Sequence, residues 1–198
     1  MSLKTIQVAL WALAAAAAIA LPIAYLSQTP VTQRSSGVAT VGGPFVLTAA
    51  NGQPFDSKSL VGKPYALFFG FTHCPDVCPT TTAEMTGFLG ELGDKAKDFR
   101  VLFVTVDPAR DTPEALKDFL SSFDPRIVGL SGSQEKIDAV VRAYGAVATR
   151  VDLDGGNYTM DHTASVFLFG ADGRLVSTLD YKENPTVKLQ KIKNLLGV

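Results

Sequence analysis

Metal-binding side chains are scarce in this chain of 198 residues. It contains two cysteines and two histidines, which excludes a disulfide-rich scaffold and any multi-cluster or multi-haem protein, and leaves enough for one small metal site. A basic excess is also lacking, because 18 Lys and Arg residues stand against 19 Asp and Glu residues. With no surplus of positive charge to neutralise phosphates, we expect no nucleic-acid partner.

Charge is absent altogether from residues 5–33. Within them, residues 8–26 are an apolar run with Trp11 and Tyr25 near its two ends. As a helix this run would extend about 29 Å, close to the hydrocarbon thickness of a bilayer. It predicts a transmembrane anchor behind a short tail at residues 1–7. A cleaved signal peptide is the alternative, but the run exceeds the usual apolar core of about 7–15 residues and lacks a good cleavage site.

The charges that flank the anchor favour a short tail inside and the bulk of the chain outside. Residues 27–44 carry Thr, Ser, Gly and Pro without periodicity and predict a linker. Residues 45–198 are then one domain. The simplest interpretation is a single-pass protein of a bacterial inner (cytoplasmic) membrane, with its soluble domain facing the periplasm.

Apolar strands alternate with amphipathic helices through this domain. Two continuous apolar runs predict strands that are buried on both faces, at Tyr65–Phe71 and Val101–Val106. Between them, apolar residues at helical spacing predict a helix that Pro79 opens and Gly93 closes. Further helices are expected to follow three N-cap residues, Thr112, Ser133 and Asn184. Turn residues predict hairpins at Asn51-Gly52 and Ala171–Gly173, and a hairpin or loop at Asp154–Gly156. This order predicts a thioredoxin-like three-layer α/β/α sandwich with a mixed sheet.

The two cysteines lie together, Cys74 and Cys78, between a buried strand and a helix. Ligands gather outside the carboxyl ends of strands in such sheets, and a helix N-terminus should acidify both thiols. Because Pro79 disfavours helical geometry in the residue before it, we expect both cysteines in a loop. The spacing permits a disulfide or two ligands for one ion, and a disulfide across so short a loop would stabilise the fold little.

His162 is the candidate third ligand. It precedes the strand Ser165–Phe169, which we expect beside Tyr65–Phe71, so that the loop with the histidine faces the cysteine loop. Two sulfurs and one imidazole suit Cu(I) in a trigonal site, or Cu(II) with added nitrogen or oxygen ligands. Zinc with a fourth ligand fits the spacing as well.

Four more side chains are expected around the metal: His73, Asp76, Asp107 and Asp161. His73 adjoins a cysteine and should point to the opposite side. Asp161 either orients the histidine ligand or is a turn residue. Helix capping is the first interpretation of both Asp107 and Asp111. For Asp107, at the carboxyl end of a central strand, the alternative is that it tunes the site or orients a partner.

Three blocks of the sequence resemble the Sco/SenC family. The first and most specific is Phe69–Pro79, which reads FGFTHCPDVCP. The second is Val106–Glu114, and the third is Asp161–Thr163, followed by an apolar strand and Asp172-Gly173. Together with the anchor layout, the resemblance covers roughly residues 45–198. The family's members are membrane-anchored, thioredoxin-fold copper proteins that help assemble the dinuclear copper centre of cytochrome c oxidase.

By position, the resemblance implies that Cys74, Cys78 and His162 are the copper ligands, for Cu(I), Cu(II) or both. It also implies that the thiolates bind copper when they are reduced and lose it when they form a disulfide. The leading hypothesis is therefore a copper chaperone rather than an enzyme. Its partner would be the copper-receiving subunit of cytochrome c oxidase, with other copper chaperones or thiol reductants as further partners.

The alternative is a thiol–disulfide oxidoreductase that reduces the cysteines of the oxidase subunit or of another extracytoplasmic partner. Against a general thioredoxin role, Ala164 aligns where thioredoxins resemble one another in a cis-proline. A peroxidase of the same fold is a third hypothesis. It would need an Arg or a Gln/Trp pair beside the thiolate, and the single tryptophan, Trp11, lies in the predicted anchor.

Overall fold

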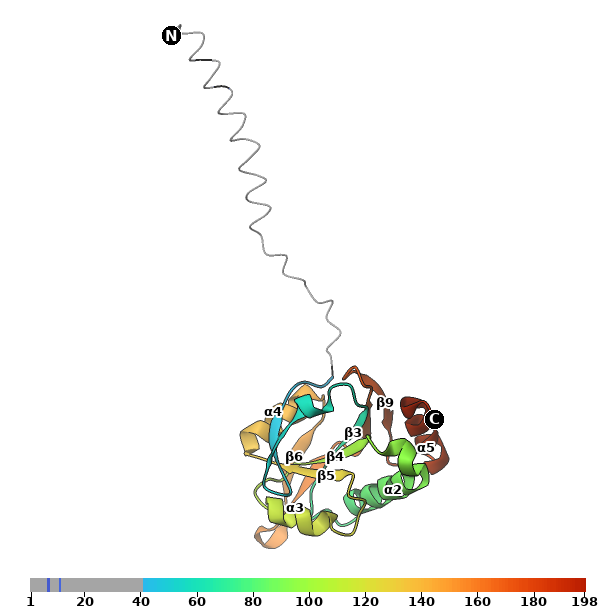
Figure 1. Cartoon of the computed structure of the whole chain (residues 1–198). Coiled ribbons are helices and arrows are strands. Elements are labelled where there is room, and N and C mark those ends of the chain that lie inside the picture. Colours follow the sequence, from blue (N-terminus) through green and yellow to red (C-terminus); the bar gives the residue numbers. More distant parts are fainter. Residues whose placement is uncertain (1–6, 8–10, 12–40) are drawn as a thin grey trace. The chain divides into compact units, whose positions relative to one another are not determined.

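A seven-stranded mixed sheet, in the order β2-β1-β5-β4-β3-β8-β9, is the centre of the fold, and β6 and β7 form a second, two-stranded sheet. The computed structural model describes Gln7, Trp11 and residues 41–198 (Figure 1). The strands are β1 (Val46–Ala49), β2 (Pro54–Asp56), β3 (Tyr65–Gly70), β4 (Arg100–Thr105), β5 (Ile127–Ser131), β6 (Ala148–Asp152), β7 (Tyr158–His162), β8 (Val166–Phe169) and β9 (Leu175–Leu179). The helices are α2 (Val77–Leu92), α3 (Pro113–Leu120), α4 (Gln134–Ala143) and α5 (Pro185–Leu196), with short 3-10 turns at Ser57–Leu60, Gly93–Ala96 and Asp154–Gly156.

The predicted anchor at residues 8–26 lies outside the described residues except for Trp11, as do most of the predicted tail (1–7) and the predicted linker up to residue 40. In the part of the chain that the structure describes, no helix has both the length and the apolar character needed to cross a bilayer.

Strand β3 has one parallel and one antiparallel neighbour in the sheet. It pairs in parallel with β4, and antiparallel with β8 through partners such as Leu67 and Phe167. All six of its residues are buried, which explains why its sequence is continuously apolar instead of alternating. The prediction that the strand after the histidine lies beside Tyr65–Phe71 is therefore confirmed. This pairing brings the end of β3, which leads into the cysteines, next to the start of β8.

Helices cover both faces of the sheet (Figure 1). On one face, Phe103 of β4 packs against Phe119 of α3, with ring centroids 5.4 Å apart. The buried Lys188 of α5 pairs with Glu84 of α2 at 2.8 Å, which places these two helices side by side. The opposite face carries Tyr144, the residue at the end of α4. The predicted three-layer arrangement with a mixed sheet is confirmed.

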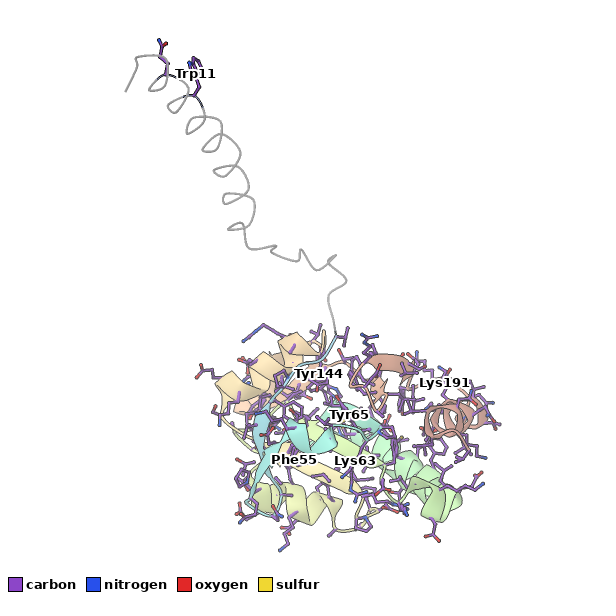
Figure 2. All side chains as sticks on the ribbon, turned by 45° about the horizontal axis from the view of Figure 1, so that its top comes forward. Trp11, Phe55, Lys63, Tyr65, Tyr144 and Lys191 are labelled. Atoms are coloured by element: carbon purple, nitrogen blue, oxygen red, sulfur yellow. The ribbon has the colours of Figure 1, made fainter. Side chains whose placement is uncertain are left out.

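Tyr144 organises the core on its own face (Figure 2). Its hydroxyl oxygen lies 3.3 Å from that of Tyr65, and its ring packs edge-on against Phe69 and Phe169. Burial raises the pKa of both phenols, so both stay neutral at physiological pH. The pair satisfies two polar groups in an otherwise apolar layer, which avoids the cost of burying an unpaired hydroxyl.

The predicted helix boundaries hold except at α2. Thr112, Ser133 and Asn184 each accept a hydrogen bond as N-cap of the next helix. Helix α2, however, begins at Val77, two residues before Pro79, so the prediction that both cysteines lie in a loop is wrong for Cys78. The first backbone N–H groups of a helix have no intrahelical acceptor. A proline in the first turn therefore forfeits no hydrogen bond, and the helix tolerates it.

The segment around Asp154–Gly156 forms a hairpin. Strand β6 pairs with β7 from Ala148 opposite His162 to Asp152 opposite Tyr158. His162 is thus the last residue of a strand, and its predicted place in a loop is wrong. Among the described residues, β7 pairs with only one other strand. Few of its residues therefore need to be apolar, and its sequence lacks the pattern of a buried strand.

Gly70 generates a stability prediction, because a Cβ atom there would lie 2.8 Å from Cζ of Phe103 and 3.0 Å from Cε1 of Phe68. Both rings are buried and cannot move away freely. We expect Gly70→Ala to lower the free energy of unfolding of the full chain, purified in detergent, by about 1–3 kcal/mol. Gly87, in the exposed part of α2, has no atom within 4 Å of such a Cβ. Gly87→Ala should therefore leave stability unchanged or raise it by up to about 1 kcal/mol. Equal denaturation midpoints for the two variants would contradict this account of the packing.

Candidate metal centre

Cys74, Cys78 and His162 come together at the carboxyl end of β3. Their ligand atoms all lie within 4.8 Å of one another, and Sγ of Cys78 lies 3.4 Å from Nε2 of His162. Two of these residues flank the start of α2 and the third ends β7. The two cysteines are neighbours in sequence, whereas the β3–β8 pairing brings the distant His162 to them.

The two cysteines differ in exposure. Cys78 is fully buried, whereas Cys74 is half-buried in the loop before α2. The backbone N–H of Cys78 points at Sγ of Cys74, 3.4 Å away, so the first turn of α2 directs one of its free donors at this sulfur. Burial raises the pKa of the Cys78 thiol far above its ordinary value. The expectation that the helix acidifies both thiols is thus wrong for Cys78, because desolvation outweighs the helix. A cation that replaces the proton would offset this cost.

His162 presents a neutral imidazole to the sulfurs. Its Nδ1 lies 3.0 Å from the carbonyl oxygen of Thr163, and because a carbonyl can only accept, Nδ1 carries the hydrogen. The lone pair is then on Nε2, the atom that faces Cys78. Burial lowers the pKa of His162, although the bond to Thr163 and the charge of Asp161 act in the opposite direction. A neutral ring with its second nitrogen fixed by a carbonyl is the form in which histidine binds metals.

Asp111 holds the cysteine loop in place. Its carboxylate is fully buried and accepts hydrogen bonds from the backbone N–H of Thr72 (3.0 Å), the Thr72 hydroxyl (2.6 Å) and the Thr105 hydroxyl (2.6 Å). The cap of α3 is instead Thr112, which accepts from the N–H of Ala115. Helix capping, the first alternative for Asp111, is therefore wrong. The residue fixes the chain two positions before Cys74.

Asp107 contacts the strand that carries His162. It is buried, accepts a hydrogen bond from the Tyr158 hydroxyl at 2.9 Å, and pairs with Nε of Arg110. Capping is wrong for this residue too, since its carboxylate joins the end of β4 to the start of β7. Sequence reasoning did not single out Tyr158, Arg110 or Thr72. Thr72 lies inside the first sequence block and Arg110 inside the second, which was the signal in the sequence for these two residues.

The three other residues expected around the metal, His73, Asp76 and Asp161, make fewer contacts with the site. His73 is 55% exposed and stays outside the donor group, with Nδ1 3.9 Å from Asp111, in line with the expectation that it points away. Asp76 is exposed, and its carboxylate accepts a hydrogen bond from the hydroxyl of Thr80 at 3.3 Å but does not cap α2. Asp161 is exposed. The hydrogen bond that orients His162 is donated by its Nδ1–H to the carbonyl of Thr163, so Asp161 acts through charge alone.

The donor set decides which metals fit. Two thiol sulfurs and one imidazole nitrogen are soft ligands, which favour Cu(I) over hard cations such as Mg²⁺ and Ca²⁺. Among the residues that the structure describes, no fourth protein ligand joins these three atoms, and three ligands satisfy the trigonal geometry of Cu(I). Structural zinc sites, by contrast, almost always have four protein ligands. The residues therefore fit copper well.

Comparisons with known proteins agree with this chemistry. The family model described as SCO1/SenC matches residues 33–197. The mitochondrial protein SCO2 of Saccharomyces cerevisiae is 38% identical over 163 residues, which cover 81% of this chain but 54% of the yeast protein. The chain thus spans about half the length of that relative.

Solved structures match the described domain. ScoI of Bradyrhizobium japonicum with copper bound is 46% identical, with a TM-score of 0.73, over 78% of this chain and 99% of that chain. BsSco is described as a member of the Sco family of cytochrome c oxidase assembly proteins, with a disulfide switch. It is 25% identical, with a TM-score of 0.64, over 84% of this chain and 99% of BsSco. The resemblance of the three sequence blocks is confirmed, and the chain belongs to the SCO1/SenC family.

Proposed function

We propose that this chain is a membrane-anchored copper-binding protein that delivers copper to the copper-receiving subunit of cytochrome c oxidase and helps assemble its dinuclear copper centre. The observation that carries the proposal is the convergence of Cys74, Cys78 and His162 within 4.8 Å. The copper-bound structure of a relative that is 46% identical supports copper as the metal. The description of BsSco supports the role in oxidase assembly.

The difference in burial between the cysteines suggests how copper leaves. Cys78 is buried and Cys74 is half-exposed. A thiolate of the acceptor therefore reaches the metal from the side of Cys74, and copper passes by exchange of one ligand at a time. Cys78 and His162 hold the ion until the new ligands are in place. Copper is thus the cargo of the protein, and no bond in a substrate is broken.

The N-terminal segment completes the proposal. Residues 8–26 anchor the chain in the inner membrane, residues 27–44 form a linker, and residues 45–198 form the copper-binding domain in the periplasm. Anchoring confines the domain to the surface where the oxidase subunit lies, which raises the effective concentration of each for the other.

The second candidate function is a thiol–disulfide oxidoreductase. The proximity of the two sulfurs, which lie within 4.8 Å of each other, favours it, as does the disulfide switch described for BsSco. In this reaction the two thiols of Cys74 and Cys78 become a disulfide. Their two electrons and two protons pass to a disulfide of the partner, which becomes two thiols.

The copper site predicts a specific loss on removing the imidazole. We expect the reduced full chain to bind one equivalent of Cu(I) in competition with a chelator. His162→Ala should weaken this binding by at least about tenfold, or about 1.4 kcal/mol, because one of three ligands is lost. Cys78→Ser should abolish competition. The matched control is His73→Ala, which removes the other histidine, outside the donor group. Equal weakening by the two histidine variants would contradict the site.

Delivery and reduction predict different products when the copper-loaded protein meets the isolated copper-receiving domain of the oxidase subunit. If the acceptor is supplied with reduced cysteines, we expect copper to move to it while Cys74 and Cys78 remain thiols, as followed by mass spectrometry under anaerobic conditions. The oxidoreductase predicts no copper transfer. It predicts instead that copper-free protein reduces an oxidised acceptor stoichiometrically, with loss of both thiols.

The anchor predicts the topology of the chain. A C-terminal alkaline phosphatase fusion, which folds only in the periplasm, should be active and should sediment with membranes. Deletion of residues 2–26 should leave the fusion inactive in the cytoplasm, because no segment then directs export. Active fusion protein released in soluble form from the intact chain would instead indicate a cleaved signal peptide.

A further inference from the structure

The two-stranded sheet that carries His162 has a single ladder of hydrogen bonds, between β6 and β7, whereas a strand such as β3 is paired on both sides. Among the described residues, β6 and β7 pair only with each other. An isolated two-stranded hairpin is marginally stable in water. Something other than sheet pairing must therefore hold His162 at 3.4 Å from the buried sulfur of Cys78.

The contacts of Tyr158, the first residue of β7, supply this attachment. Its ring lies between two guanidinium groups, with Cζ of Arg110 and Cζ of Arg150 each 3.7 Å from the ring centroid. Its hydroxyl donates to Asp107 at 2.9 Å, and its carbonyl accepts from Nη1 of Arg110 at 3.1 Å. Ring, hydroxyl and backbone of one residue are thus all engaged.

The unpartnered nitrogen of Arg110 indicates that the stack on Tyr158 stabilises the guanidinium in its position. Its Nη2 atom is buried and has no hydrogen-bond partner among the described residues, which costs free energy. The guanidinium is kept there by its stacking on Tyr158, by its pairing with Asp107, and by a second ring, Phe71, at 5.9 Å. Phe71 in turn packs edge-on against His162, with centroids 5.8 Å apart.

The register of β7 transmits the attachment to the ligand. Tyr158 and His162 are four residues apart on one strand, so their side chains point to the same face. At about 3.4 Å per residue they lie roughly 14 Å apart. Fixing the ring at one end of the strand sets the rotation of the strand about its axis, and hence the direction of the imidazole at the other end.

We propose that Tyr158, clamped between Arg110 and Arg150, is a positioning residue that fixes the imidazole of His162 for metal binding before the metal arrives. The proposal rests on the proposed copper function and deepens it. Pre-organisation of the third ligand lowers the cost of ordering the site and so raises affinity. Loss of the clamp leaves all three ligands present but the histidine free to turn away.

The test is a double-mutant cycle in the full chain, with Cu(I) affinity measured against a competing chelator. Tyr158→Leu keeps apolar bulk but removes the stack and the hydroxyl, and should weaken binding by about tenfold. Tyr158→Phe keeps the stack and should lose less. In a His162→Ala background, Tyr158→Leu should cause no further loss, because the clamp acts through the imidazole. A further loss of the same size there, or none in the parent, overturns the proposal.

A second variant, at an exposed residue, tests the proposal even if Tyr158→Leu fails to fold. The side chain of Arg150 is 55% exposed, so Arg150→Gln removes half of the clamp without disturbing the core. It should weaken Cu(I) binding by about two- to fivefold, again only when His162 is present. The matched control is Arg174→Gln, on the β8–β9 turn and 83% exposed, which should leave the affinity unchanged. Equal effects of the two arginine variants overturn the proposal.

A readout in the copper-free protein separates this proposal from the copper function. In the parent, nitrogen NMR of His162 should show one tautomer, with the hydrogen on Nδ1. In Tyr158→Leu the signals should average between the tautomers. If the parent does not bind copper, the proposed function fails while this spectrum still decides whether the clamp positions the ring. Identical spectra in parent and variant overturn the clamp even if copper binds.

Discussion

The buried carboxylate of Asp111 is the constraint on which the site depends. A charged group removed from water is costly unless hydrogen bonds replace its hydration. Here Thr72 and Thr105 supply three of them, while Ser131 donates to the backbone carbonyl of the same residue. These partners lie at the ends of β3, β4 and β5. The carboxylate therefore ties the ends of β3 and β4 together and fixes the loop that carries Cys74, and the backbone carbonyl of Asp111 adds the end of β5.

The same network extends to the opposite wall of the metal centre. The Thr105 hydroxyl that donates to Asp111 also accepts from the N–H of Asp107 at 2.9 Å, and Asp107 binds Tyr158 at the start of β7. The cysteine loop and the histidine strand are thus both attached to residues 105–111. Donors that are distant in sequence keep their spacing because one short, buried segment holds both sides.

Much of this architecture could be predicted because local chemistry decided it. Continuous burial marks β3, N-cap side chains mark α3, α4 and α5, and the scarcity of cysteine and histidine narrowed the metal centre to a few residues. The order of strands then placed His162 near the sulfurs before any coordinates were considered.

The remaining features depend on contacts between distant segments. Asp111 and Asp107 look like helix caps in sequence, and only the fold shows that Thr72 and Tyr158 meet them. Helix α2 starts before Pro79 because a helix tolerates proline in its first turn. The general rule that the residue before a proline avoids helical geometry does not take this position into account. The desolvation of Cys78 depends on how deeply α2 packs, which spacing alone cannot give.

The point at which the chain enters the domain has a geometric consequence. Gly42 donates its N–H to the carbonyl of Ala143 and lies against Phe169, the residue paired with Tyr65 at the beginning of β3. The donor atoms lie beyond the other end of that strand, roughly 17 Å farther along at 3.3 Å per residue. Gly42 and the metal-binding side chains therefore lie at opposite ends of the domain. Because these two places lie at opposite ends of one strand, a partner that contacts the donor atoms leaves the residues around Gly42 uncovered.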